Sequence, residues 1–144
     1  RSPMAEALFA SRMPEPWRDS VEPSSAGTAA ADGMKAAPSA IKALSEIGIN
    51  LHGHRTRYLT RQMIEEADLI VAMAGGHRDE MVDLVPSARE KIIVLGEVDP
   101  RRDSVDIEDP IGRGEETYRG ARDEIDRLTA LLIDYLVANY DLVK

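Results

Sequence analysis

Two uninterrupted apolar runs constrain the fold of this chain more than any other feature. Residues 69–73 read Leu-Ile-Val-Ala-Met and residues 92–95 read Ile-Ile-Val-Leu, so each run has the length of a β-strand. Strands that are apolar on both faces belong to parallel sheets that helices cover on both sides. Residues 79–85, between the runs, carry Met81, Leu84 and Val85 at helical spacing, which predicts a right-handed strand–helix–strand unit. We therefore expect an α/β fold in three layers, with a small parallel sheet and helices on both faces.

Further helices are predicted at residues 3–13, 38–47, 61–67 and 115–139. In the second of these, Ile41, Leu44 and Ile47 form the buried stripe and Gly48 follows as a stop signal. Thr60 is placed to cap the third helix. The last helix has a core-facing stripe at intervals of three and four, formed by Tyr118, Ala121, Ile125, Leu128, Leu132 and Tyr135. All these elements fit one domain over residues 1–144.

The sheet predicted from the sequence is short of strands. Residues 21–26 read as a third strand, but Pro23 restricts it to a sheet edge. One edge strand and two buried strands are too few to separate two layers of helices. We therefore expect a strand that precedes Arg1, and an N-terminally truncated domain.

Composition excludes several classes of function. The net charge of −8 and the isoelectric point near 4.9 argue against a nucleic-acid partner, because no basic face of the required size is available. No apolar run approaches the roughly 18 residues that span a bilayer, so we expect no membrane partner and a cytoplasmic location. The chain has no cysteine, which excludes a thiol nucleophile within the 144 residues. We expect no cofactor and no metal, and residues 52–57 are interpreted as a solvated basic loop.

The first residues combine a helix start with a cation. Ser2 is a good N-cap and Pro3 suits the first helical position. A helix N-terminus offers unpaired N–H groups and a partial positive charge, and the Arg1 guanidinium lies beside them. This pattern predicts a phosphate-binding site. An ordinary capped helix with an exposed arginine remains the alternative.

Two later segments are candidates for chemistry. Asp109 precedes Pro110 in a loop rich in acids, residues 99–114, and the proline favours an extended backbone that can project the carboxyl group toward a pocket. Asp109 is therefore a candidate general acid, with a plain turn as the alternative, whereas Asp106 and Glu108 are interpreted as solvated acids. Ser25 opens the hydroxyl-rich segment Ser-Ala-Gly-Thr at residues 25–28, for which a plain loop is the alternative.

These segments resemble a known family when they are taken in order. The sequence Arg-Ser-Pro-Met-Ala-Glu-Ala-Leu-Phe at residues 1–9, then Ser-Ala-Gly-Thr, then Ile-Glu-Asp-Pro at residues 107–110 is similar to the low-molecular-weight protein tyrosine phosphatases of bacterial type. The resemblance implies parallel strands in the order 2-1-3-4, of which the first strand is missing here. It also implies a cysteine-x5-arginine-serine loop whose last two residues are Arg1 and Ser2.

The resemblance assigns roles to four residues. Arg1 would bind the phosphoryl group, Asp109 would be the general acid, and Ser2 and Ser25 would support the phosphate-binding loop. The partner would be a phosphorylated protein or an inorganic oxyanion, and the reaction would pass through a phospho-cysteine. Because the cysteine is absent from the 144 residues, we expect this chain alone to be inactive.

The substrate and even the reaction class stay open. Related eukaryotic enzymes carry aromatic residues after Asp-Pro, whereas Ile111 and Gly112 occupy this place here, so phosphotyrosine and phosphoarginine are both candidates. A catalytically inactive relative that binds phosphorylated ligands is one alternative. An arsenate reductase is another, although the absence of cysteines argues against it.

Overall fold

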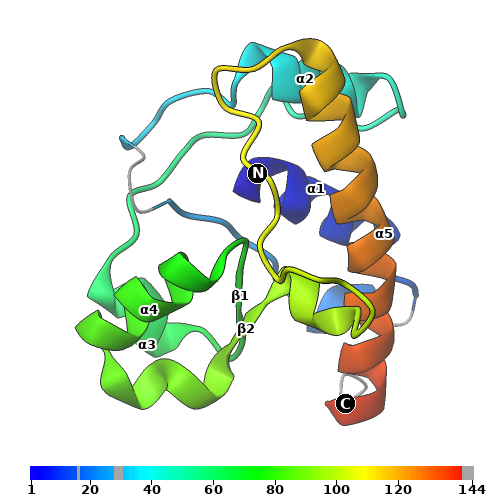
Figure 1. Ribbon diagram of the computed structural model, residues 1–144. Helices are drawn as coiled ribbons and strands as arrows, with labels where there is room; N and C mark the ends of the chain where they lie inside the picture. Colours follow the sequence, from blue (N-terminus) through cyan, green and yellow to red (C-terminus); the bar gives the residue numbers. More distant parts are fainter. Residues whose placement is uncertain (16, 28–30, 141–144) are drawn as a thin grey trace.

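The computed structural model describes residues 1–15, 17–27 and 31–140. Figure 1 shows the short strands near the centre, with the long C-terminal helix along one side and α3 and α4 on the other. In chain order the elements are α1 (Ser2–Arg12), η1 (Trp17–Ser20), α2 (Pro38–Ser45), α3 (Arg61–Glu66), β1 (Ile70–Ala72), α4 (Gly75–Leu84), η2 (Pro86–Lys91), β2 (Ile92–Val94), η3 (Leu95–Val98) and α5 (Glu115–Asn139).

The central strands β1 and β2 are parallel, with Val71 opposite Ile93, and α4 connects them. Their side chains alternate between two apolar clusters. Val71 and Ile93 pack against a core built from α1, α2 and α5, whereas Ala72 and Val94 belong to a second cluster with Ile64 of α3 and residues of α4. Helices therefore cover both faces of a small parallel sheet, which confirms the predicted three-layer α/β fold.

The long helix α5 confirms most of its predicted stripe. Tyr118, Ala121, Ile125, Leu128 and Leu132 are buried, but Tyr135 is 40% exposed and Leu136 is 6% exposed. The prediction that Tyr135 faces the core is wrong. At 3.6 residues per turn, position 136 lies closer than position 135 to the mean direction of the stripe, so the next buried side chain comes from Leu136.

Two further details of the prediction need correction. Residues 21–26 form no strand, and in the described part of the chain this region contributes only a bridge between Gly27 and Tyr58. Pro23 has no N–H to donate, and among the described residues β1 pairs only with β2 and not with this segment. In the second predicted helix, α2 ends at Ser45, and Ile47 lies beyond it and is 36% exposed. Gly48, with φ of 81°, turns the chain there.

The predicted cap of α3 is confirmed. The Thr60 side chain accepts a hydrogen bond of 3.2 Å from the Met63 N–H, so Thr60 caps α3 as predicted. Among the described helices, none is both long and apolar enough to cross a bilayer.

Candidate phosphate-binding site

Arg1 lies at the N-terminal end of α1. The structure makes Arg1 the N-cap and Ser2 the first helical residue, with no side-chain capping bond, so the prediction that Ser2 is the N-cap is wrong. The helix begins one residue earlier than predicted, because the Arg1 carbonyl accepts the Ala5 N–H at 3.0 Å. Pro3 remains within the first turn, where its missing N–H costs no helical bond.

The Arg1 guanidinium is held by the acid-rich loop. Its Nη1 donates to the Ile107 carbonyl at 2.7 Å, and its Nη2 lies 3.4 Å from Asp109 Oδ2. The side chain of Arg1 is 14% exposed and that of Asp109 is 47% exposed. A guanidinium has five N–H donors, so donors beyond these two remain for an anion. The structure therefore brings a largely buried cation and a more exposed carboxyl group to one place.

Backbone contacts fix the position of Asp109. Ile107 is 2% exposed and its N–H donates to the Met73 carbonyl at 2.8 Å, just after β1. Pro110 is fully buried, and Asp109 Oδ1 accepts the Ile111 N–H at 3.1 Å. The loop is thus anchored on both sides of Asp109. Figure 1 shows this yellow segment passing beside the N-terminus.

Tyr118 shares the surroundings of Asp109. Its side chain is 6% exposed, on the first turns of α5. Burial, followed by the nearby Asp109 carboxylate, raises the pKa of the Tyr118 phenol above its usual value. The sequence pattern assigned Tyr118 only to the core, and nothing in that pattern indicates the proximity to Asp109.

Asp106 is exposed, as predicted, and its carboxylate also makes a contact that the sequence does not indicate. Its Oδ1 accepts the Gly75 N–H at 2.8 Å, so it caps the start of α4, whose own N-cap residue, Ala74, has no side-chain acceptor. This contact spans 31 positions in the chain, so local sequence gives no signal for it. Glu108 is exposed, in an ion pair of 2.9 Å with Arg113.

Ser25 does lie against α1. Its hydroxyl donates to Glu6 Oε1 at 2.8 Å, and its carbonyl accepts Arg57 Nε at 3.3 Å. The His54 ring approaches the same carboxylate, with 4.0 Å between His54 Nδ1 and Glu6 Oε2. The His54 side chain is only 8% exposed, so the prediction of a solvated loop is wrong for this residue. Thr28, the last residue of the predicted Ser-Ala-Gly-Thr segment, lies outside the described residues.

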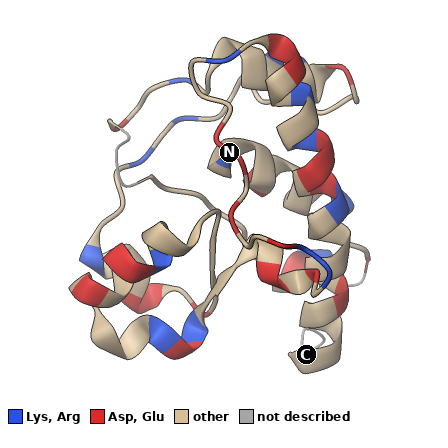
Figure 2. Cartoon of the chain, in the orientation of Figure 1, with Lys and Arg blue, Asp and Glu red and all other residues tan. Residues whose placement is uncertain are grey.

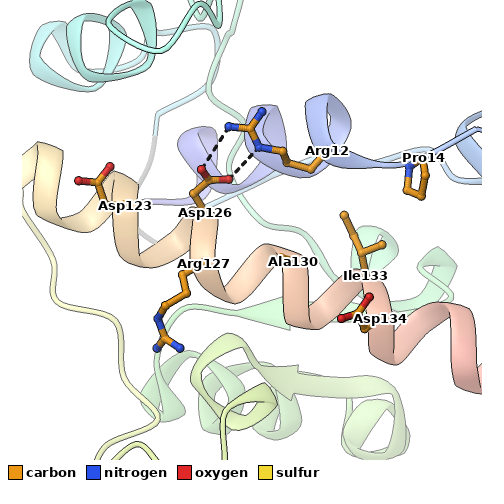
Figure 3. A pocket seen from close by; sticks show the side chains of 8 residues that line it. All are labelled: Arg12, Pro14, Asp123, Asp126, Arg127, Ala130, Ile133 and Asp134. Carbon is orange, nitrogen blue, oxygen red and sulfur yellow. Dashed lines mark hydrogen bonds and ion pairs between the residues drawn. The ribbon is translucent and has the colours of Figure 1, made fainter.

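One pocket in the described part of the chain lies away from Arg1 and is unsuited to an anion. Figure 3 shows a surface pocket between the end of α1 and the middle of α5, where Arg12 is paired with Asp126. Asp123 and Asp134 also line this pocket, so its charge disfavours a phosphate. Within residues 1–15, 17–27 and 31–140, no three histidine or acidic side chains are arranged to hold a metal ion.

The chain is similar to several bacterial phosphatases. It is 38% identical over 136 residues to the protein-arginine-phosphatase of Geobacillus stearothermophilus, covering 94% of this chain and 88% of that protein. It is 32% identical over 118 residues to Wzb of Escherichia coli strain K12, a low molecular weight protein-tyrosine-phosphatase, covering 82% of this chain and 75% of that one.

A solved structure and a family match agree with these relatives. The YwlE arginine phosphatase, as a cysteine-to-serine mutant with a phosphorylated active-site serine, superposes with a TM-score of 0.86 at 34% identity, covering 99% of this chain and 91% of that one. Residues 1–141 match the family described as low molecular weight phosphotyrosine protein phosphatase. The chain therefore belongs to the low molecular weight phosphotyrosine protein phosphatase family.

Proposed function

We propose that the protein hydrolyses phosphorylated side chains of proteins in the cytoplasm, with Arg1 binding the phosphoryl group and Asp109 acting as general acid. The contact between Arg1 and Asp109 is the observation that carries this proposal, since the two groups that the chemistry needs meet across the whole length of the chain. Ser2 and Ser25 would support the phosphate-binding loop that leads into α1. The names of the relatives support phosphotyrosine and phosphoarginine as the two candidate substrates.

The proposed reaction uses a cysteine thiolate. None of the 144 residues is a cysteine, so the nucleophile of this proposal would belong to residues that precede Arg1 in the protein. The domain described here would then be an N-terminally truncated one. The phosphorylated active-site serine in the YwlE mutant supports a covalent route, because a side chain at that site accepts the phosphoryl group.

Two displacements would complete the reaction. The thiolate attacks phosphorus and the bond to the substrate oxygen or nitrogen breaks, while the Asp109 carboxylic acid gives its proton to the leaving atom. Water then attacks the phospho-cysteine, Asp109 takes a proton from it, and phosphate leaves with the thiolate regenerated. The Arg1 guanidinium would hold two phosphoryl oxygens through both steps and offset their charge.

The test compares the protein with and without the residues that precede Arg1. The full gene product should hydrolyse p-nitrophenyl phosphate and either a phosphotyrosine peptide or a phosphoarginine protein, and acid quenching should trap a phosphoenzyme. The chain of 144 residues should show no turnover. Appreciable turnover by this chain would mean that a group other than a thiolate attacks the phosphorus.

The same assay separates the alternatives. Phosphate binding without hydrolysis by the full protein would indicate a catalytically inactive binding relative. Thioredoxin-dependent reduction of arsenate without phosphatase activity would indicate an arsenate reductase. Comparing phosphotyrosine with phosphoarginine under the same conditions decides between the two proposed substrates.

A further inference from the structure

Two exposed segments form a short antiparallel ribbon beside the candidate site. The Gly33 N–H donates to the Thr56 carbonyl at 2.8 Å, the Thr56 N–H donates to the Met34 carbonyl at 2.7 Å, and Lys35 bridges Arg55 directly. We call residues 33–35 and 55–58 the cationic ribbon. Its exposed cations are Lys35, Arg55 and Arg57.

The cations of this ribbon have no acidic partner in the described part of the chain. Elsewhere most arginines and lysines lie within 4.0 Å of a carboxylate oxygen, as Arg12, Arg119 and Arg127 do. Among the described residues, the cations without such a partner are Lys35, Arg55, Arg57, Arg61, Arg89 and Lys91. The ribbon thus concentrates uncompensated positive charge in a chain whose net charge is −8.

The polar contacts of the ribbon do not neutralise it. Arg55 Nη1 donates to the carbonyls of His52 and His54, and Arg57 Nε donates to the Ser25 carbonyl. These bonds hold the guanidinium groups in place but leave their charges unpaired. One acid does lie at the ribbon, Asp32, whose Oδ1 accepts the Tyr58 N–H at 2.7 Å. A single carboxylate against three cations leaves the ribbon positive.

The arrangement is unfavourable for the isolated protein. Lys35 and Arg55 stand directly opposite each other, and like charges at such positions destabilise a strand pair. Two large apolar side chains lie on the same ribbon, because Met34 is 59% exposed and Tyr58 is 53% exposed. Methionine, tyrosine and arginine are enriched in protein–protein interfaces. An external acidic partner would remove the repulsion and cover both apolar side chains.

The ribbon is tied to the helix that begins at Arg1. Arg57 contacts Ser25, Ser25 donates to Glu6, and the ring of His54 lies 4.0 Å from the same carboxylate. Glu6 is five residues after Arg1, which corresponds to about 7.5 Å along a helix. Figure 2 shows the blue segments of the ribbon on the loops to the left of the N-terminus. A peptide bound at Arg1 could therefore reach the ribbon with the residues that flank its phosphorylated side chain.

We propose that the cationic ribbon docks an acidic segment next to the phosphorylated residue of a protein substrate, an inference that rests on the proposed phosphatase function. Aspartate and glutamate side chains of the substrate would pair with Lys35, Arg55 and Arg57. A nucleic acid fits less well, because a long polyanion would meet the field of a chain with net charge −8, whereas a short acidic segment needs only this local cluster.

The test uses the full protein and two fluorescein-labelled phosphopeptides, one with a glutamate-rich flank and one with glutamines in the same places. Anisotropy at low salt should show about fivefold tighter binding of the glutamate peptide, and added salt should reduce the difference. The double variant Lys35→Gln/Arg55→Gln should lose the preference. The matched control Arg61→Gln/Arg89→Gln removes two exposed cations that likewise lack an acidic partner, and it should keep the preference.

Hydrolysis of p-nitrophenyl phosphate, which has no flank, separates this inference from the proposed function. Normal hydrolysis with equal binding of the two peptides overturns the docking proposal and leaves the phosphatase intact. If the full protein hydrolyses nothing but still prefers the glutamate peptide through the ribbon, the docking proposal stands and the phosphatase proposal is overturned. Equal effects of both double variants overturn the docking proposal, and so does stronger ribbon-dependent binding of a single-stranded oligonucleotide than of the glutamate peptide.

Discussion

The Arg1 guanidinium lies 3.4 Å from the Asp109 carboxylate, although 108 positions separate the two residues in the chain. The sheet explains how they meet. Met73 directly follows β1 and its carbonyl accepts the Ile107 N–H, so the loop that carries Asp109 is anchored at the carboxyl end of a parallel strand. In open α/β sheets this end is where ligands bind. The N-terminus of α1 is at the same place, because Arg1 itself donates to Ile107.

The first prediction concerns the general acid. In the full protein, Asp109→Asn should lower kcat/KM for phenyl phosphate by about 10²–10⁴-fold, because the poor leaving group depends on the proton that Asp109 would give in the first displacement. The effect on p-nitrophenyl phosphate should be smaller, since its leaving group is stable as an anion. Steady-state kinetics with both esters measures the difference.

Glu108→Gln is the matched control for Asp109. Glu108 is the neighbouring acid, and it is exposed in a surface ion pair with Arg113. Its substitution should leave kcat/KM for both esters unchanged. Equal rates for the wild type and Asp109→Asn with phenyl phosphate would remove Asp109 from the mechanism.

The second prediction concerns the phosphoryl contact. Arg1→Lys keeps the positive charge but loses the fork that can hold two oxygens at once. We expect the inhibition constant of inorganic phosphate to rise about 10–100-fold, the range that a lost charge-assisted hydrogen bond implies. Arg12→Lys, at the other end of α1 and bonded to Asp126, should leave this constant unchanged. An unchanged constant in Arg1→Lys would show that Arg1 does not touch the anion.

Hydrophobic pattern was sufficient to predict much of this fold. The runs at residues 69–73 and 92–95 became the parallel strands β1 and β2, and residues 115–139 became α5 with the predicted bounds. Such patterns report burial, which depends on the side chains themselves and on a fixed helical or strand period. The prediction that Arg1 and Asp109 share one site came from the resemblance to a family, because no local pattern links residues so far apart.

What the sequence missed depends on contacts between distant segments. The sequence does not show that Asp106 caps α4, because its partner, the Gly75 N–H, is not a neighbour in the chain. His54 looked exposed because its neighbours are polar, yet it lies against Glu6 of α1. Residues 21–26 looked like a strand because of their composition, but a strand also needs a partner to form its ladder. Each of these features depends on where a segment packs rather than on which residue types it contains.

The third prediction tests how the acid loop is seated. Gly96 is buried within η3, and a Cβ there would lie 2.7 Å from the Val105 carbonyl carbon and 2.8 Å from its Cα. These are backbone atoms, which cannot move aside as the end of a flexible side chain can.

 Gly96→Ala should therefore lower the free energy of unfolding by about 1–3 kcal/mol, measured by urea denaturation. It should also lower kcat of the full protein, because Val105 belongs to the loop that positions Asp109.

Gly76→Ala provides the control for this substitution. Gly76 is an exposed residue of α4, and a Cβ there meets no atom within 4 Å. Alanine favours a helix over glycine, so this variant should be more stable by about 0.5–1 kcal/mol. If Gly96→Ala were as stable as the wild type, the close approach of Val105 would not constrain the loop.

The last prediction concerns acid stability. Asp99 is 7% exposed, with its carboxylate accepting the Arg101 N–H at 3.0 Å and Arg127 Nη1 at 2.9 Å. The backbone bond from Arg101, followed by the bond from Arg127, holds the pKa of Asp99 below its usual value. A carboxyl group with a lower pKa in the folded state stabilises the protein above its unfolded pKa, about 3.9 for aspartate, and this contribution is lost as the pH falls through the folded pKa.

Asp99→Asn should therefore lower the urea midpoint at pH 7 and flatten its decline between about pH 5 and pH 3. Part of the decline should remain, because ion pairs with arginine also lower the pKa of Glu46 and of Glu124. Asp103→Asn is the control, since Asp103 is exposed and has no ion pair among the described residues. A decline equally steep in Asp99→Asn and in the wild type would mean that the bonds to Arg101 and Arg127 contribute no pH-dependent stability.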